Sequence, residues 1–378
     1  MSLYKFLGML GLFALAVGWA GGCGSMPPAP GSFYSASARS IAGSPGHLIR
    51  SEPLSGAPSG AAAWKVLYVS TGLDGRPTAV SGVVIAPTLP APSAGRPIVA
   101  WAHPTTGVAD NCAPSIREGF FDTIPHLPAL IALDYVVAAT DYEGLGTPGV
   151  HPYLVGVSEG RSVLDSVRAA RQIEKTGAGT RFAVWGHSQG GHAALFTGQL
   201  VKSYAPDLSL VGVAAIAPAT ELAELLRDDV EERVGRILGA FCLWSWSRIY
   251  DTPLTPIVKA SAVSAVDRVA RDCIESEGEG YRAAFDSLPL PSSFLSADAY
   301  TVEPWKHLLA ENRPGQTPVG APIYVAQGTE DSIVRPSVTS DFVEGLCRGG
   351  EIVRMERFSG VNHFKASHVS ASSAIQWM

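Results

Sequence analysis

The sequence has little charge and lacks the motifs of several protein classes. Asp, Glu, Lys and Arg make up only 16% of its 378 residues, and the formal net charge is −6. It has no basic run and no basic platform interleaved with aromatic rings, so we expect no nucleic-acid partner. It also lacks a His-Glu-x-x-His motif, a Cys-x-x-Cys pair and a glycine-rich phosphate loop after its first predicted strand. We therefore expect neither a metal nor a cofactor.

Long apolar runs are scarce as well, and the clearest one lies at the N-terminus. Residues 6–20 are apolar after Lys5, about the length of a signal-peptide core and short for a membrane span. The run ends in Ala20-Gly21-Gly22-Cys23, which resembles a bacterial lipoprotein signal, where the cysteine becomes the first residue and carries lipid. We predict a signal peptide over residues 1–22, lipidation of Cys23, and an exported protein anchored to the outer membrane or cell surface. Ordinary cleavage, giving a secreted or periplasmic protein, is the alternative.

Cysteine is rare, with five in the chain. Export implies an oxidising compartment, in which the four cysteines after Cys23 can form disulfides. These are Cys112, Cys242, Cys273 and Cys347. Four cysteines allow three complete pairings, and the residues alone do not choose among them.

The remaining chain reads as a linker followed by one large domain. Residues 23–47 are rich in Gly, Pro, Ser and Ala and are predicted to be a lipoprotein tether, with the stretch from about Phe33 a candidate to wrap the domain. Residues 48–378 contain alternating β and α patterns. A hairpin at 64–70 and 78–86 precedes short apolar runs typical of buried parallel strands, at 98–102, 136–140, 182–185, 211–217 and 323–326. The clearest helix is predicted at 161–175.

One interval breaks this alternation. Helical patterns at 221–240 and 256–270 lie between two predicted strands, and we predict a helical cap inserted at about 219–315. The cap contains the aromatic cluster Phe241-Cys242-Leu243-Trp244-Ser245-Trp246. These rings can either pack the cap on the main domain or line an acyl-binding channel.

The most informative motif is Gly186-His187-Ser188-Gln189-Gly190, between the strand at 182–185 and a helix predicted at 191–204. A serine between two glycines on a strand-to-helix turn is the nucleophile elbow of an α/β-hydrolase. The turn lifts the serine hydroxyl above the sheet, and the glycines avoid collisions with neighbouring backbone. We predict an α/β-hydrolase fold, a mostly parallel sheet flanked by helices, with Ser188 as nucleophile. His187 and His192 are expected to be packing residues.

A serine nucleophile needs a base, and the base needs an acid that orients it. In this fold the acid and then the base follow the serine in the chain. Asp331, in the loop after the strand at 323–326, is preferred as the acid over Glu330. His363, in a turn near the C-terminus, is preferred as the base over His368, which falls in a predicted terminal helix.

The reaction also needs two backbone N–H groups directed at the developing oxyanion, each worth about 3–4 kcal/mol. One is expected from Gln189, directly after the nucleophile. The other is expected from the loop His103-Pro104-Thr105-Thr106-Gly107 after the strand at 98–102. The residues alone do not decide between Thr105 and Thr106.

With these residues assembled, the chain resembles the secretory lipase family, which includes the lipase A-type enzymes, from about Leu48 to its end. The resemblance rests on the elbow, the Asp331 loop and four further segments: 103–107, 111–115, 141–144 and 203–206. It implies a triad of Ser188, Asp331 and His363, an oxyanion hole from Gln189 and Thr106, and a helical cap. It also implies hydrolysis of carboxylic esters, acylglycerols included.

The resemblance further implies a disulfide between Cys112 and Cys273. Cys347 resembles a second bridging position, while the family's long C-terminal flap has no counterpart before Met378.

These patterns predict a serine hydrolase acting on lipidic or other carboxylic esters through an acyl-enzyme. A peptidase or amidase on the same fold is the first alternative, because the triad chemistry is shared and pocket shape decides the substrate. A surface binding protein without catalytic activity is the second.

Overall fold

The computed structural model describes residues 29–228, 232–277, 280–283, 290 and 294–378. The signal peptide predicted over residues 1–22 and the predicted lipidation site Cys23 lie outside these ranges. In the part of the chain that is described, no helix is long and apolar enough to cross a membrane. The first buried side chains, Phe33 and Tyr34, pack against Leu67 of the main domain.

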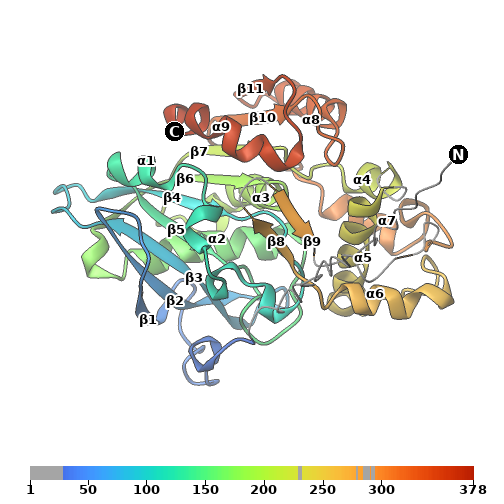
Figure 1. Ribbon diagram of the computed structural model, residues 1–378, viewed down its shortest axis with the longest axis horizontal. Helices are drawn as coiled ribbons and strands as arrows, with labels where there is room; N and C mark the ends of the chain where they lie inside the picture. The colour runs from blue at the N-terminus through green and yellow to red at the C-terminus, as the bar shows by residue number, and fades with distance from the viewer. Residues whose placement is uncertain (1–28, 229–231, 278–279, 284–289, 291–293) are drawn as a thin grey trace, which may run out of the picture.

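A nine-stranded sheet forms the centre of the molecule, in the order β1-β2-β3-β5-β4-β6-β7-β10-β11 (Figure 1). Along this order, the first three neighbouring pairs, from β1 to β5, are antiparallel. The remaining five, from β5–β4 to β10–β11, are parallel. The strands are β1 (Leu48–Leu54), β2 (Ala61–Thr71), β3 (Pro77–Pro87), β4 (Arg96–Ala102), β5 (Val136–Thr140), β6 (Ala178–His187), β7 (Ser209–Ile216), β10 (Ile323–Gly328) and β11 (Val353–Phe358). Because β6, β7, β10 and β11 are parallel neighbours, the loops that follow them meet at one edge of the sheet.

The sequence patterns missed the first strand of this sheet. The hairpin predicted first in the chain is preceded by β1, which pairs with β2 at the edge of the sheet. Its residues are exposed or half-buried throughout and show no alternation. Backbone pairing with β2 holds this edge, and a hydrophobicity pattern carries no signal for such pairing.

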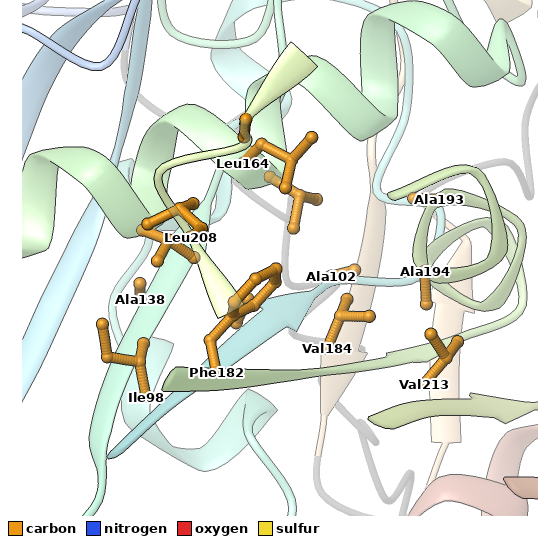
Figure 2. Packing of buried hydrophobic residues seen from close by; sticks show 14 of the residues in the cluster. Ile98, Ala102, Ala138, Leu164, Phe182, Val184, Ala193, Ala194, Leu208 and Val213 are labelled. Atoms are coloured by element: carbon orange, nitrogen blue, oxygen red, sulfur yellow. The ribbon is translucent and has the colours of Figure 1, made fainter. Parts of the chain in front are cut away.

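Five helices cover the two faces of the sheet. They are α1 (Leu127–Ala132), α2 (Gly156–Ala170), α3 (Gln189–Tyr204), α8 (Pro336–Arg348) and α9 (His363–Trp377). Helices α2, α3 and α8 share a core with one face of the sheet, and α1 and α9 share a core with the other. Figure 2 shows Leu164 of α2 and Ala193 and Ala194 of α3 above strand residues such as Val184.

The helix α2 lies five residues earlier than the predicted 161–175. Its first five residues include Gly156 and Gly160, which have low helix propensity and therefore weaken the pattern there. A Cβ at Gly156 would lie 2.2 Å from the ring of Phe196, so the glycine permits close contact between α2 and α3. Close packing of the two helices thus overrides intrinsic propensity.

The helical cap lies between β7 and β10, to the right of the sheet in Figure 1, and forms a second hydrophobic core together with Val108 and residues 153–155. Its elements are α4 (Leu222–Asp228), α5 (Arg233–Ile249), α6 (Val263–Val269), α7 (Trp305–Glu311) and the hairpin β8 (Ile274–Glu277) and β9 (Gly280–Ala283). The helix predicted at 221–240 is two helices, α4 and α5. The one predicted at 256–270 is only α6, because Val258 pairs with Leu295 in an antiparallel bridge instead of entering a helix.

Candidate active site

Ser188 occupies a sharp turn between β6 and α3. Its φ of 58° and ψ of −115° form a strained backbone conformation for a residue with a side chain. The Ser188 N–H donates to the carbonyl of Ile216 on β7, and its carbonyl accepts from Ala219 N–H. Neighbouring strand ends thus hold the turn in place.

The flanking glycines are required by close backbone contacts. A Cβ at Gly186 would lie 2.0 Å from the carbonyl oxygen of Gly190, and one at Gly190 would lie 1.9 Å from that of Ala102. Both distances are far inside van der Waals contact, so neither position accepts a side chain without moving backbone.

The structure brings Ser188, His363 and Asp331 together at the edge where β6, β10 and β11 end. His363 Nε2 lies 2.9 Å from Ser188 Oγ, and His363 Nδ1 lies 2.8 Å from Asp331 Oδ2. All three residues are buried, with exposures of 8% for Ser188, 5% for His363 and 3% for Asp331. A proton can therefore move from the hydroxyl to an imidazole that a carboxylate orients.

Asp331 is held by more groups than the sequence indicated. Its Oδ1 accepts from the N–H groups of Ile333 and Val334, and its Oδ2 also accepts from Gln327 Nε2 at 3.0 Å. Gln327 is itself fixed, because its Oε1 accepts from the Thr339 hydroxyl. Sequence reasoning missed Gln327, and its only signal was its place at the end of the strand before Asp331.

The competing residues lie elsewhere. Glu330 and His368 are both exposed, and neither contacts Ser188 or His363 by a described hydrogen bond. His363 is the first residue of α9, rather than part of a turn ahead of it, and Asn362 caps the helix by accepting from Lys365 N–H. The start of α9 therefore sets the position of the His363 side chain.

His187 and His192 lie close to Ser188 in the chain and are both buried. The His187 ring packs on the His363 ring with centroids 4.8 Å apart, and burial lowers the pKa of His187 well below its ordinary value. A neutral ring beside His363 is a packing partner rather than a second base. His192 contacts Glu159, and no group of three or more His, Cys, Asp or Glu side chains is placed to hold a metal among the residues described.

The loop after β4 lies beside Ser188. Thr105 lines the same cavity as Ser188 and His363, whereas Thr106 does not. The Thr105 hydroxyl lies 2.9 Å from that of Tyr153, and the Thr106 carbonyl accepts from Ile274 N–H on β8. The loop is thus tied to the cap.

A disulfide strengthens this connection. Cys112 and Cys273 are bonded with their Cα atoms 5.3 Å apart, and Gly107 forms a β-bridge with Cys273. Cys242 and Cys347 are free in the structure.

Replacing Cys112 and Cys273 together with serine is expected to lower the free energy of unfolding by about 2–5 kcal/mol, since the bridge closes a long loop. We also expect ester turnover to fall at temperatures where the variant is still folded, because the chain just after the Thr105 loop loses its covalent link to Cys273, the residue before β8. Urea unfolding and kcat measured on one sample check this. Unchanged kcat in the folded variant would contradict the second part, and Cys347→Ser is the matched control.

Two narrow apolar cavities of about 50 Å³ each open from Ser188. They share Leu238 and Ile333 as a common wall, and one of them runs along α5 past Gly235, Gly239 and Cys242. A larger hollow of about 710 Å³ lies near the N-terminal segment and contains none of Ser188, Asp331 and His363, so it is separate from this site.

The aromatic cluster of α5 belongs mainly to the core of the cap. Phe241 and Trp246 are fully buried there, and the Trp246 indole donates to the carbonyl of Tyr153. Of this cluster, only Cys242 lines a cavity that contains Ser188. Packing is therefore the main role of these rings.

Comparisons with known proteins agree with this architecture. The family model described as secretory lipase matches residues 122–378. A Mycobacterium tuberculosis protein named probable inactive lipase is 24% identical over 88% of this chain and 78% of its own length. The trichothecene C-3 esterase of Fusarium sporotrichioides is 23% identical over 100% of this chain and 89% of its own length.

Among solved structures, Candida antarctica lipase A in its closed state superposes with a TM-score of 0.75 at 17% identity, covering 93% of this chain and 86% of that one. This likeness shows the α/β-hydrolase fold. Because the family model covers well over half of the sequence, the chain belongs to the secretory lipase family.

Proposed function

We propose that this protein is an exported carboxylic ester hydrolase that works through an acyl-enzyme on Ser188. The observation that carries the proposal is the continuous hydrogen-bonded chain Asp331–His363–Ser188, opening on two apolar cavities. Family membership supports ester hydrolysis as the reaction class.

In this mechanism His363 Nε2 takes the proton of Ser188 as Oγ attacks the ester carbonyl. The Nδ1–H of His363 donates to Asp331, whose carboxylate stabilises the imidazolium that forms. The C–O bond to the alcohol then breaks, and His363 returns the proton to the leaving oxygen. Water, activated by the same imidazole, attacks the acyl-serine and releases the acid.

The tetrahedral oxyanion would be received by the backbone N–H of Gln189. Gln189 is the first residue of α3, so its N–H has no acceptor within the helix and lies at the positive end of the helix dipole. Because Thr105 shares the cavity with Ser188, its N–H is favoured over that of Thr106 as the second donor.

The cavity size favours short acyl groups. Pockets for drug-sized ligands usually measure about 300–1,000 Å³. The two cavities at Ser188 measure about 50 Å³ each, too little for the chain of a long fatty acid without movement of the cap. Their apolar walls suit short alkyl groups on either side of the ester bond.

An ester series with purified protein and a fluorophosphonate probe tests the proposal. We expect the probe to label Ser188, and kcat/KM for p-nitrophenyl esters to be highest at butyrate or shorter and to fall towards oleate. Equal rates across the series would overturn the short-chain preference alone. Faster hydrolysis of peptide anilides than of esters would favour an amidase, and absence of both labelling and turnover would favour a binding protein without activity.

A further inference from the structure

A buried carboxylate on α2 contacts the first turn of α3, and the triad does not use it. Glu159 is 1% exposed, and its Oε1 accepts from Gln189 Nε2 at 2.9 Å and from Leu154 N–H at 3.1 Å. Its Oε2 lies 2.7 Å from Nδ1 of His192, which is fully buried. A carboxylate without such partners would be very costly at this depth, so these contacts define one orientation of Glu159.

The side chain of Gln189 is fixed by the same contacts. Its Nε2 donates to Glu159 and also lies 3.1 Å from His151 Nε2. His151 Nδ1 donates to the carbonyl of Glu143, and burial lowers the pKa of His151 to about 3, so its ring is neutral and Nε2 accepts. The Gln189 Oε1 is buried with no partner. Two acceptors therefore hold the amide nitrogen in a single position.

This anchor acts where the helix itself provides little support. The first residues of an α-helix have N–H groups without intrahelical acceptors. Gln189 is the first residue of α3, and it follows Ser188, whose φ is 58°. The amide of Gln189 therefore gives this turn an attachment point on α2 that the α3 backbone does not supply.

His192 extends the contacts to the cap. Its Nε2 lies 2.8 Å from the carbonyl of Asn312, directly after α7, and a carbonyl can only accept. Nε2 therefore carries a proton, and Nδ1 faces a carboxylate, so Glu159 and His192 share one further proton. Asn312 in turn accepts from Gly156 N–H and donates to the hydroxyl of Tyr250, next to α5.

We infer that Glu159, supported by His192, is a positioning residue that holds the N–H of Gln189 in place for the oxyanion and ties this turn to the end of the cap. The inference rests on the proposed function, because it assigns a purpose to the oxyanion donor of that site.

Kinetics of four variants provide the first test. Glu159→Ala and Gln189→Ala are each expected to lower kcat by about 10- to 100-fold, the effect of a misplaced catalytic group, with KM changed less than about threefold. The double variant should be no worse than either single one, because both remove the same contact. Glu159→Gln should recover most of kcat, since its amide oxygen can accept from Gln189 while its N–H donates to a neutral His192.

Asp165→Asn is the matched control. Asp165 is a fully buried carboxylate on the same helix α2, but it accepts from Ser70 and Tyr204, away from the first turn of α3. Asp165→Asn should leave kcat unchanged even where it lowers the free energy of unfolding as much as Glu159→Ala does. A fall in kcat equal to that of Glu159→Ala would reduce Glu159 to a structural role and overturn the inference.

Hydrogen exchange gives a measurement that does not depend on activity. Exchange of a peptide covering residues 186–195 should rise in Glu159→Ala and not in Asp165→Asn. If the wild-type protein has no ester activity, the proposed function fails, and the exchange comparison still tests the positioning. Exchange equal to wild type in Glu159→Ala would overturn the inference whatever the wild-type activity.

Discussion

Replacing Ser188 with alanine is expected to lower kcat for p-nitrophenyl butyrate by about 10⁴- to 10⁶-fold while leaving the fold intact. Without Oγ no acyl-enzyme can form, and residual turnover comes only from binding and the oxyanion donors. His363→Ala should give a loss of the same size, because a serine hydroxyl without a base is a weak nucleophile. The double variant should be no slower than either single one, since the two residues act as a unit.

Circular dichroism and thermal unfolding establish that these variants are folded, and single-turnover kinetics measure acylation. His368→Ala is the matched control, because His368 lies on the same helix α9 and is exposed. It should retain wild-type activity. Substantial turnover by Ser188→Ala would place the nucleophile elsewhere.

The second large effect is expected from Asp331→Asn, which should lower kcat by about 10⁴-fold. In the wild-type protein the Asp331 carboxylate accepts four hydrogen bonds, including the one from His363 Nδ1. An amide nitrogen in its place would face Nδ1 as a donor and favour the imidazole tautomer with its proton on Nε2. That proton would point at Ser188 Oγ, and His363 could no longer act as the base.

The control for this variant is Glu330→Gln, one residue away. Glu330 is exposed and should tolerate the change with wild-type kcat. If Glu330→Gln lost activity while Asp331→Asn kept it, the assignment of the acid would be reversed. The pH dependence of kcat/KM separates a change of His363 tautomer from a smaller amount of folded enzyme. Only the change of tautomer alters the shape of the curve of kcat/KM against pH.

Several features could be read from the sequence because they depend on local chemistry. The glycines around Ser188 mark the elbow, since a Cβ added at either one would lie about 2 Å from a carbonyl oxygen. The central strands were predictable because both of their faces are buried, which produces continuous apolar runs. Chain order in this fold then selected Asp331 and His363, whose side chains the structure places within hydrogen-bonding distance.

Other features depend on contacts between residues far apart in the chain, and no local pattern encodes them. The edge strand β1 forms because its backbone pairs with β2. The bounds of the cap helices are set by packing in the cap's hydrophobic core and by the bridge between Val258 and Leu295. Sequence alone could not show that Thr105 lines the cavity at Ser188 while Thr106 does not, because cavity lining depends on how the cap packs.

The amino-acid sequence by itself determined the family, the fold class and the candidates for catalysis, because each leaves its mark in adjacent residues. Only the tertiary structure decided how Gln327 supports Asp331 and how Glu159 and His192 hold the first turn of α3. Those contacts join buried polar groups from separate elements. Their hydrogen bonds become strong only where packing has removed water, which no stretch of sequence achieves alone.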